Sequence, residues 1–176
     1  MNCLCDEGSI VFSKFKLADN YITDFAIVGQ ERNTNSISAF VSLVEIERSD
    51  KPLFTKSGDP TSFLSHSVRQ VQNWKTWYEE NRAFLKKRYK DILLQNPLEQ
   101  IVPPNRYYRN YEYFGLDYGF YARYFCIVGR RKDLTIRDNV LLGQMNHDLD
   151  EIHIITYDVL LENFIKLLKR LKYDGF

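Results

Sequence analysis

One stretch of the chain, Val41–Glu47, limits the possible folds more than any other. Its sequence is Val-Ser-Leu-Val-Glu-Ile-Glu. Side chains alternate between the two faces of a β-strand, so Leu43, Glu45 and Glu47 share one face. The apolar residues predict a strand that begins in a hydrophobic core. The two acids predict that the same strand ends in a polar pocket.

A second short apolar run, Asp24–Val28, precedes this strand and also begins with an acid. The residues between the two runs, 29–36, have turn composition, which predicts that the runs pair as a hairpin. In that arrangement Asp24 lies near Glu45 and Glu47. Three carboxylates beside a core are costly unless a cation or a raised pKa compensates. Hard oxygen ligands of this kind suit Mg²⁺ or Mn²⁺.

The next segment predicts a helix over residues 60–81. Asp59 is a favourable capping residue, and Pro60 is favoured in the first turn. At about 100° per residue, the apolar side chains of this helix form a stripe that faces the sheet. Gln70 lies at the edge of the buried region among aromatic residues. That position suits a polar group directed at a site, and it equally suits a simple boundary residue.

Basic residues gather in two further places. A second helical stretch carries Lys86 and Lys87 together with other cations. A turn later in the chain carries Arg130 and Arg131. Both groups could bind phosphate, and both could be ordinary solvated surface. Residues 105–124 are rich in tyrosine and arginine, which would either stack on nucleic-acid bases or pack over the sheet.

The expected elements change type along the chain. Strands are expected at about 9–17, 24–28, 41–47, 124–128 and 152–156, and helices at about 60–81, 82–95 and 158–171. This order predicts a mixed α/β (α+β) fold around one sheet. The length of 176 residues predicts a single domain over 1–176, in which about residues 1–19 form a short N-terminal extension.

Composition narrows the class of protein. A hydrophobic content of 44% with 27% charged residues is ordinary for a soluble globular protein. No apolar run approaches the ~20 residues of a membrane span. An odd number of cysteines and the lack of a signal peptide favour a cytoplasmic location. Because the formal net charge is +1, nucleic-acid binding would depend on local basic patches.

Several blocks occur in a characteristic order. They are Thr23–Phe25, Leu43–Arg48, Leu53–Pro60, Leu64–Trp74, Ile127–Arg131 and Ile154–Asp158. Together they resemble the C-terminal nuclease domain of the Shedu anti-phage defence proteins, a branch of the PD-(D/E)xK nuclease superfamily. The resemblance covers about residues 20–165. It implies a restriction-endonuclease-like core with a central mixed sheet flanked by helices.

The resemblance also implies roles for individual residues. By position, Asp24 matches the first metal-binding acid of the superfamily and Glu45 matches the second. Glu47 falls where most members have a lysine that orients the attacking water or stabilises the transition state. A Glu-x-Glu version is known among restriction enzymes of the superfamily, where the second glutamate acts as a base or a further metal ligand. Gln70 matches the glutamine that positions the nucleophile or substrate, and His66 falls in the same block without a defined role.

The activity implied by the resemblance is metal-dependent endonucleolytic cleavage of DNA in anti-phage defence. The implied cofactor is Mg²⁺ or Mn²⁺. The implied partners are DNA, further copies of the chain in a homo-oligomer, and a separate sensing or regulatory subunit. Binding to a membrane is not expected. Weaker candidates for DNA contact are His66, Lys86, Lys87, Arg130 and Arg131.

Two departures from the family pattern keep alternatives open. One is Glu47 at the usual lysine position. The other is the short N-terminal region, since longer relatives carry additional sequence there. The chain could be a minimal member, a truncated remnant or one part of a split system. The alternative functions are a non-catalytic nucleic-acid-binding or regulatory module on a degenerate nuclease fold, and a structural subunit of an oligomer.

Overall fold

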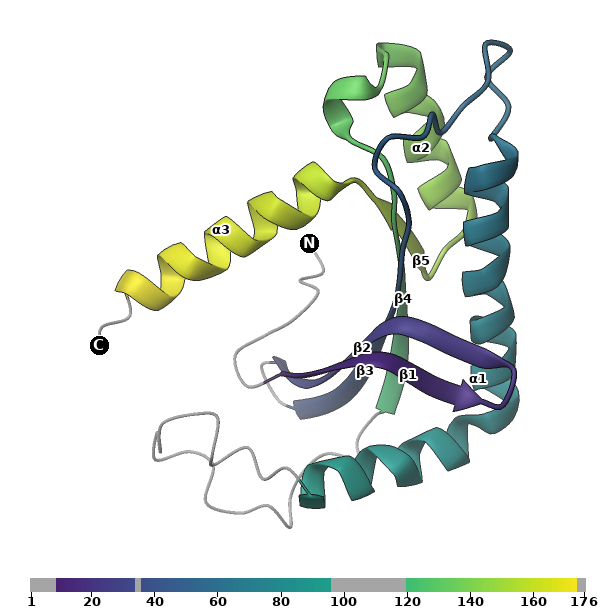
Figure 1. Ribbon diagram of the computed structural model, residues 1–176. Helices are drawn as coiled ribbons and strands as arrows, with labels where there is room; N and C mark the ends of the chain where they lie inside the picture. The colour runs from purple at the N-terminus through teal and green to yellow at the C-terminus, as the bar shows by residue number, and fades with distance from the viewer. Residues whose placement is uncertain (1–8, 34–35, 96–119, 174–176) are drawn as a thin grey trace. The chain divides into compact units, whose positions relative to one another are not determined.

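The computed structural model describes residues 9–33, 36–95 and 120–173 (Figure 1). Its elements are β1 (Ile10–Ala18), β2 (Tyr21–Asn33), β3 (Ser36–Ile46), α1 (Ser62–Gln95), β4 (Phe120–Ile127), a short 3-10 helix (Arg131–Asp133), α2 (Ile136–Asp148), β5 (Ile152–Ile155) and α3 (Tyr157–Tyr173). The strands form one sheet in the order β1-β2-β3-β4-β5. Strands β1 and β2 are antiparallel, whereas β4 and β5 are parallel. The predicted mixed α+β class with a mixed sheet is therefore confirmed.

Contacts divide the chain into two compact units. Unit 1 comprises Met1–Leu43 and Asn73–Arg123, and unit 2 comprises Val44–Gln72 and Tyr124–Phe176. The boundaries fall inside β3, α1 and β4, so three elements contribute residues to both units. The single domain expected from the sequence stays a prediction.

The hairpin of β2 and β3 differs from the sequence-based expectation in the length of its strands. Residues 29–36 were expected to form the turn, but β2 continues to Asn33 and β3 begins at Ser36. Turn-forming residues mark where a chain can reverse, whereas continued backbone pairing decides where the strands stop. At its other end β2 begins at Tyr21, earlier than expected, so Asp24 lies inside the strand and not at its start.

In unit 1, aromatic side chains tie the second part of α1 to the strands. The Tyr89 hydroxyl donates to the carbonyl of Gly29 at 3.0 Å, and the Tyr78 hydroxyl donates to the carbonyl of Phe120 at 3.3 Å. The helix departs from helical geometry at Asn81, where φ is −119° and ψ is 21°. Two separate helical stretches were expected to meet between residues 81 and 82, and the structure has one helix with an irregularity at that place.

The start of α1 also differs from the expected one. The helix begins at Ser62, and the Thr61 hydroxyl accepts a hydrogen bond from the N–H of Leu64, as a capping residue does. Asp59, the expected cap, instead accepts a hydrogen bond from the Ser57 hydroxyl inside the preceding turn. Pro60 lies in an isolated β-bridge with Phe54. Because Pro60 pairs with Phe54 in the connection, the helix begins after the proline.

In unit 2, the segment between β3 and α1 is bonded to itself and to α2. Thr61 donates from its N–H to the carbonyl of Leu53 and from its hydroxyl to the carbonyl of Pro52. The guanidinium of Arg137, on α2, donates to two carbonyls in the turn over residues 55–59. This connection, called the β3–α1 connection below, therefore has a defined conformation from the end of the strand to the start of the helix.

Gly129 is expected to tolerate no side chain. Its φ is +54°, and an added Cβ would lie 3.2 Å from the buried Leu53 side chain. We expect Gly129→Ala to lower the free energy of unfolding by about 1–3 kcal/mol, because alanine is strained at positive φ and meets packed atoms. Thermal or urea unfolding measures the change.

Gly143 provides the matched control for that substitution. It lies in α2, and an added Cβ meets nothing within 4 Å. We expect Gly143→Ala to raise stability by about 0.5–1 kcal/mol, because alanine is the better helix former. Equal effects of the two substitutions would contradict the role assigned to Gly129.

Within the described ranges, no helix is both long and apolar enough to span a membrane.

Candidate active site at the end of strand β3

Glu45 and Glu47 lie at the end of β3, in unit 2. Glu45 is the penultimate residue of the strand and is 7% exposed, and Glu47 follows the last residue of the strand. Alternation along the strand places the two side chains on one face, as the sequence predicts. The strand thus brings two carboxylates together next to its buried apolar residues.

The position of Glu47 is fixed by three hydrogen bonds from three different elements. Its backbone N–H donates to the carbonyl of Ile127 on β4 at 2.9 Å. Its carbonyl accepts from the Tyr157 hydroxyl at the start of α3 at 2.6 Å. Its carboxylate oxygen Oε1 accepts from the Ser67 hydroxyl on α1 at 3.0 Å. The residue is therefore held in place even though the strand has ended.

Helix α1 presents two polar side chains on the side of Glu47. Ser67, which bonds Glu47, is fully buried, and Gln70 is half-buried three residues later. Residues three apart on a helix are neighbours on one face, so Gln70 lies beside Ser67. His66 is exposed. Of the two helix residues expected from the sequence, Gln70 is half-buried near Ser67 and His66 is not.

The Cys126 thiol on β4 lies near enough to both carboxylates for their charges to change its pKa. Burial of this residue, and then the negative charges of Glu45 and Glu47, raise the pKa of the Cys126 thiol to about 12. Each effect disfavours the thiolate, because a buried anion loses its hydration and is repelled by like charge. Both carboxylates therefore act on the same part of the sheet.

The protein is expected to lose stability between pH 9 and pH 12 because of Cys126. The folded state keeps this thiol protonated up to a pKa of about 12, whereas the ordinary value is 9.0. Stability from this group is complete below pH 9 and is lost as the pH rises toward 12, with a limiting slope of about 1.4 kcal/mol per pH unit.

Urea unfolding in the presence of EDTA, repeated across this pH range for the wild type and Cys126→Ala, measures the effect. The alanine variant should show the flatter stability profile, since it lacks the titrating group. Parallel profiles for the two proteins would contradict the assignment.

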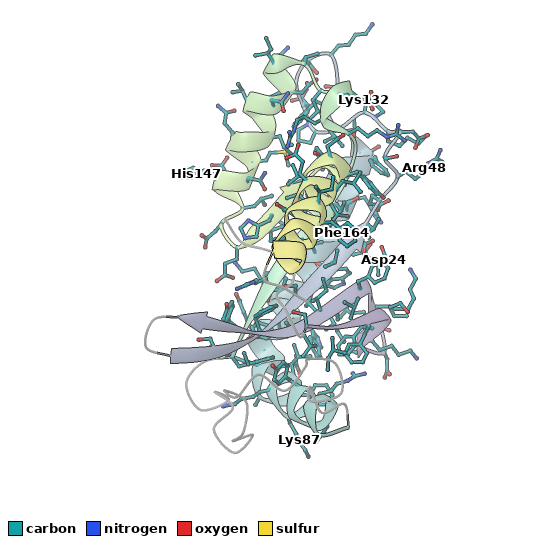
Figure 2. The ribbon with its side chains drawn as sticks, turned by 90° about the vertical axis from the view of Figure 1, so that its left-hand side faces the viewer. Asp24, Arg48, Lys87, Lys132, His147 and Phe164 are labelled. Atoms are coloured by element: carbon teal, nitrogen blue, oxygen red, sulfur yellow. The ribbon has the colours of Figure 1, made fainter. Side chains whose placement is uncertain are left out.

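Asp24, the third acid expected from the sequence, belongs to unit 1. It forms an ion pair with Lys14 of β1. The flanking pairs Ser13–Phe25 and Phe15–Thr23 place Lys14 opposite Asp24 in the antiparallel ladder. Figure 2 labels this residue. The convergence of Asp24 with Glu45 and Glu47 stays a prediction.

A complete ligand set of side chains is not preassembled in the parts of the chain that the structure describes. Within residues 9–33, 36–95 and 120–173, no group of three or more His, Cys, Asp or Glu side chains is placed to hold a metal ion. The metal ligands expected from the sequence, Asp24, Glu45 and Glu47, thus remain expected ligands.

The basic residues expected to contact DNA differ in their surroundings. In unit 2, the Arg131 guanidinium pairs with Glu162 of α3 at 2.7 Å, whereas Arg130 is exposed and donates to the Ser49 hydroxyl at 3.2 Å. In unit 1, Lys87 of α1 is exposed (Figure 2) and Lys86 is half-buried. Arg130 and Lys87 therefore present charge to solvent, while Arg131 is already paired.

The tyrosine-rich segment lies largely outside the described residues. In its described part, the buried Arg123 guanidinium lies over the Phe40 ring, 4.1 Å from its centroid, and over the Tyr121 ring at 5.2 Å. These contacts are packing contacts within unit 1. Residues 120–124 belong to strand β4 of the sheet itself, so the choice between stacking on bases and packing over the sheet stays a prediction for the rest of the segment.

A comparison with protein families identifies the relatives of this chain. The family model described as "Shedu protein SduA, C-terminal" matches residues 2–161. The chain belongs to this Shedu family. Membership confirms the resemblance to the Shedu family and associates the chain with anti-phage defence. Among curated proteins, none matches the chain significantly.

Two residues of this Shedu-family site were not predicted as site residues from the sequence. Ser67 lies three residues before Gln70, and that spacing was the available signal. Tyr157 contacts Glu47 across a long sequence separation. No local pattern predicts that contact.

Proposed function

We propose that this Shedu-family chain is a metal-dependent DNA endonuclease of anti-phage defence, built on a PD-(D/E)xK core. Family membership supports the defence role. The observation that carries the catalytic part is the fixed geometry of Glu47, held at its N–H, its carbonyl and one carboxylate oxygen on the same face as Glu45. Such preorganisation is typical of residues that act on a reacting group.

The donor chemistry of this strand end suits Mg²⁺ or Mn²⁺. Glu45 and Glu47 would provide hard anionic oxygens, which these ions prefer. Glu45 is almost fully buried, and a bound cation would favour the charged form of its carboxylate there. Asp24 is included in the proposal as a further ligand because it matches the first metal-binding acid of the superfamily. When bound, the ion would stabilise negative charge on the phosphodiester and make a bound water more acidic.

The protein side chains divide the remaining work. Glu45 binds the ion, and Glu47 either binds it or accepts the proton of the attacking water. Gln70, next to Ser67 on α1, donates from its amide to the nucleophile or to a phosphate oxygen. The water would then form a bond to phosphorus in line as the bond from phosphorus to the leaving oxygen breaks, and the leaving oxygen would take a proton from solvent. Arg130 and Lys87, both exposed, are candidates for contacts with the DNA backbone, as are His66, Lys86 and Arg131.

A cleavage assay tests this proposal. The full chain is incubated with supercoiled plasmid and with linear DNA, with Mg²⁺, with Mn²⁺ and with EDTA. We expect nicking or linearisation that depends on the ion and stops with EDTA. Absence of cleavage under every metal condition would overturn the catalytic proposal.

The second candidate function is a non-catalytic DNA-binding or regulatory module. The observation in its favour is Glu47 itself, which replaces the usual lysine with a group of opposite charge. Retention of DNA that weakens with rising salt, without cleavage in the same assay, would support this alternative.

A homo-oligomer and a separate sensing subunit are part of the proposal. Helix α3 exposes the apolar side chains of Leu161, Phe164 and Ile165, each at least half-exposed. Figure 2 labels Phe164 on this helix. Burial of such side chains against another chain is favourable. Sedimentation velocity of the chain alone, and again with a candidate subunit, would measure both associations.

A further inference from the structure

We propose that Ser67 is a positioning residue that sets the orientation of the Glu47 carboxylate. The proposal rests on the proposed nuclease function and deepens it. It concerns the hydrogen bond from the Ser67 hydroxyl to the Glu47 carboxylate. The contact joins two residues that are 20 positions apart in the sequence, on the end of β3 and on α1.

The geometry favours a directed hydrogen bond. The Ser67 side chain is fully buried, and its Oγ lies 3.0 Å from Oε1 of Glu47. The same Oγ lies 3.0 Å from the carbonyl of Phe63, one turn earlier in α1. A serine hydroxyl has one proton, so the two acceptors compete. The carboxylate is the stronger acceptor because it is charged.

The Phe63 carbonyl defines the competing structural interpretation. Serine within a helix commonly bonds the carbonyl four residues earlier, which satisfies its hydroxyl without any role in a site. If that were all, removal of the hydroxyl would change stability and leave the behaviour of Glu47 unchanged. The two interpretations therefore differ in whether Ser67 and Glu47 are coupled.

The physical consequence for Glu47 is selection of one carboxylate orientation. A glutamate side chain has several rotatable bonds, and ordering it costs free energy. The bond from Ser67 engages Oε1 and leaves Oε2 for a metal ion or for the attacking water. Tyr157 and Ile127 hold the backbone of Glu47 at the same time. Backbone and carboxylate are thus fixed by separate contacts.

A double-mutant cycle on cleavage tests the proposal. Ser67→Ala should lower the cleavage rate by about 10- to 100-fold, the usual effect of losing a partner that orients a ligand. Ser67→Thr, which keeps the hydroxyl, should restore most of the rate. In a Glu47→Ala background, Ser67→Ala should have no further effect, because the group that it orients is gone. Ser65→Ala, at an exposed position of the same helix, is the matched control.

The same cycle is repeated with Mn²⁺ affinity as the readout, measured by electron paramagnetic resonance on the full chain. Ser67→Ala should weaken Mn²⁺ binding about tenfold when Glu47 is present and not when it is absent. Equal effects in both backgrounds, in cleavage and in binding, would overturn the positioning role. So would wild-type affinity and rate in Ser67→Ala.

The outcomes separate this proposal from the nuclease function on which it rests. Mn²⁺ binding that depends jointly on Ser67 and Glu47, without any DNA cleavage by the wild type, would remove the nuclease function and retain the positioning role. Cleavage that is independent of Ser67 would do the reverse. A wild-type protein that neither binds Mn²⁺ nor cleaves DNA would overturn both.

Discussion

Replacing Glu45 with glutamine is expected to abolish metal-dependent DNA cleavage without unfolding the protein. Glutamine has nearly the same shape as glutamate but lacks the negative charge that would bind Mg²⁺ or Mn²⁺. Loss of the several kcal/mol that a metal ion contributes to the transition state lowers the rate by at least about a thousandfold. Plasmid cleavage under saturating metal, compared between the two proteins, measures the loss.

The same substitution should leave the free energy of unfolding unchanged or raise it, although it lowers the cleavage rate. Glu45 is 7% exposed, and burial removes less hydration free energy from a neutral amide than from a carboxylate. The Cys126 pKa should also fall, because the Glu45 charge contributes to raising it. Thermal unfolding and thiol titration in EDTA check these expectations.

Glu80→Gln, an exposed acid on α1, is the matched control and should cleave like the wild type. Cleavage by Glu45→Gln at the control rate would contradict the assignment of Glu45 as a ligand. The corresponding substitution Asp24→Asn tests whether this acid joins the same ligand set. If Asp24 is a ligand, Asp24→Asn should lower the cleavage rate by about as much as Glu45→Gln does.

The second large loss of cleavage rate is expected on substitution of Glu47 by glutamine or by lysine. Removal of a general base or metal ligand costs about 100- to 10,000-fold in rate, so Glu47→Gln should be severely impaired. Glu47→Lys restores the residue that is usual in the superfamily. It should nevertheless fail to recover activity here, since the Ser67 hydroxyl donates to an anionic oxygen at this position.

Single-turnover cleavage by the two Glu47 variants measures this difference, and Mn²⁺ affinity separates the two roles of the residue. A ligand role predicts weaker Mn²⁺ binding in both variants, whereas a pure base role predicts slow cleavage with unchanged binding. Wild-type activity in Glu47→Lys would show that the position needs only a polar group, which would contradict a specific role for the carboxylate.

Elements with a strong hydrophobic period were predicted from the sequence, whereas α2 and the short 3-10 helix were not. Alternation in Val41–Glu47 was sufficient to place Glu45 and Glu47 on one face. Helix α2 was not predicted because it buries a single residue, Leu142, whereas Ile136 and Val140 are largely exposed. One buried side chain leaves no apolar stripe. The remaining signal was the capping box of Thr135 and Asp138 at its start.

The contacts that complete the site were beyond sequence reasoning for a different reason. Ser67 reaches Glu47 and Tyr157 reaches its carbonyl only because the strand end, α1 and α3 meet in the fold of unit 2. Likewise, Arg131 appeared as a free cation in the sequence but pairs with Glu162, 31 positions away. Local patterns indicate which residues are polar and not which partners they find.

The β3–α1 connection loses its conformational entropy when the chain folds and not when a ligand binds. It joins Glu47 to the helix that carries Ser67, and its carbonyls are bonded by Thr61 and by Arg137 of α2. Ordering a flexible connection of this kind costs about 1–2 kcal/mol per residue. Here that cost falls on folding, so it does not weaken the later binding of an ion or a nucleic acid. Chain stability and ligand affinity are in this way set by separate steps.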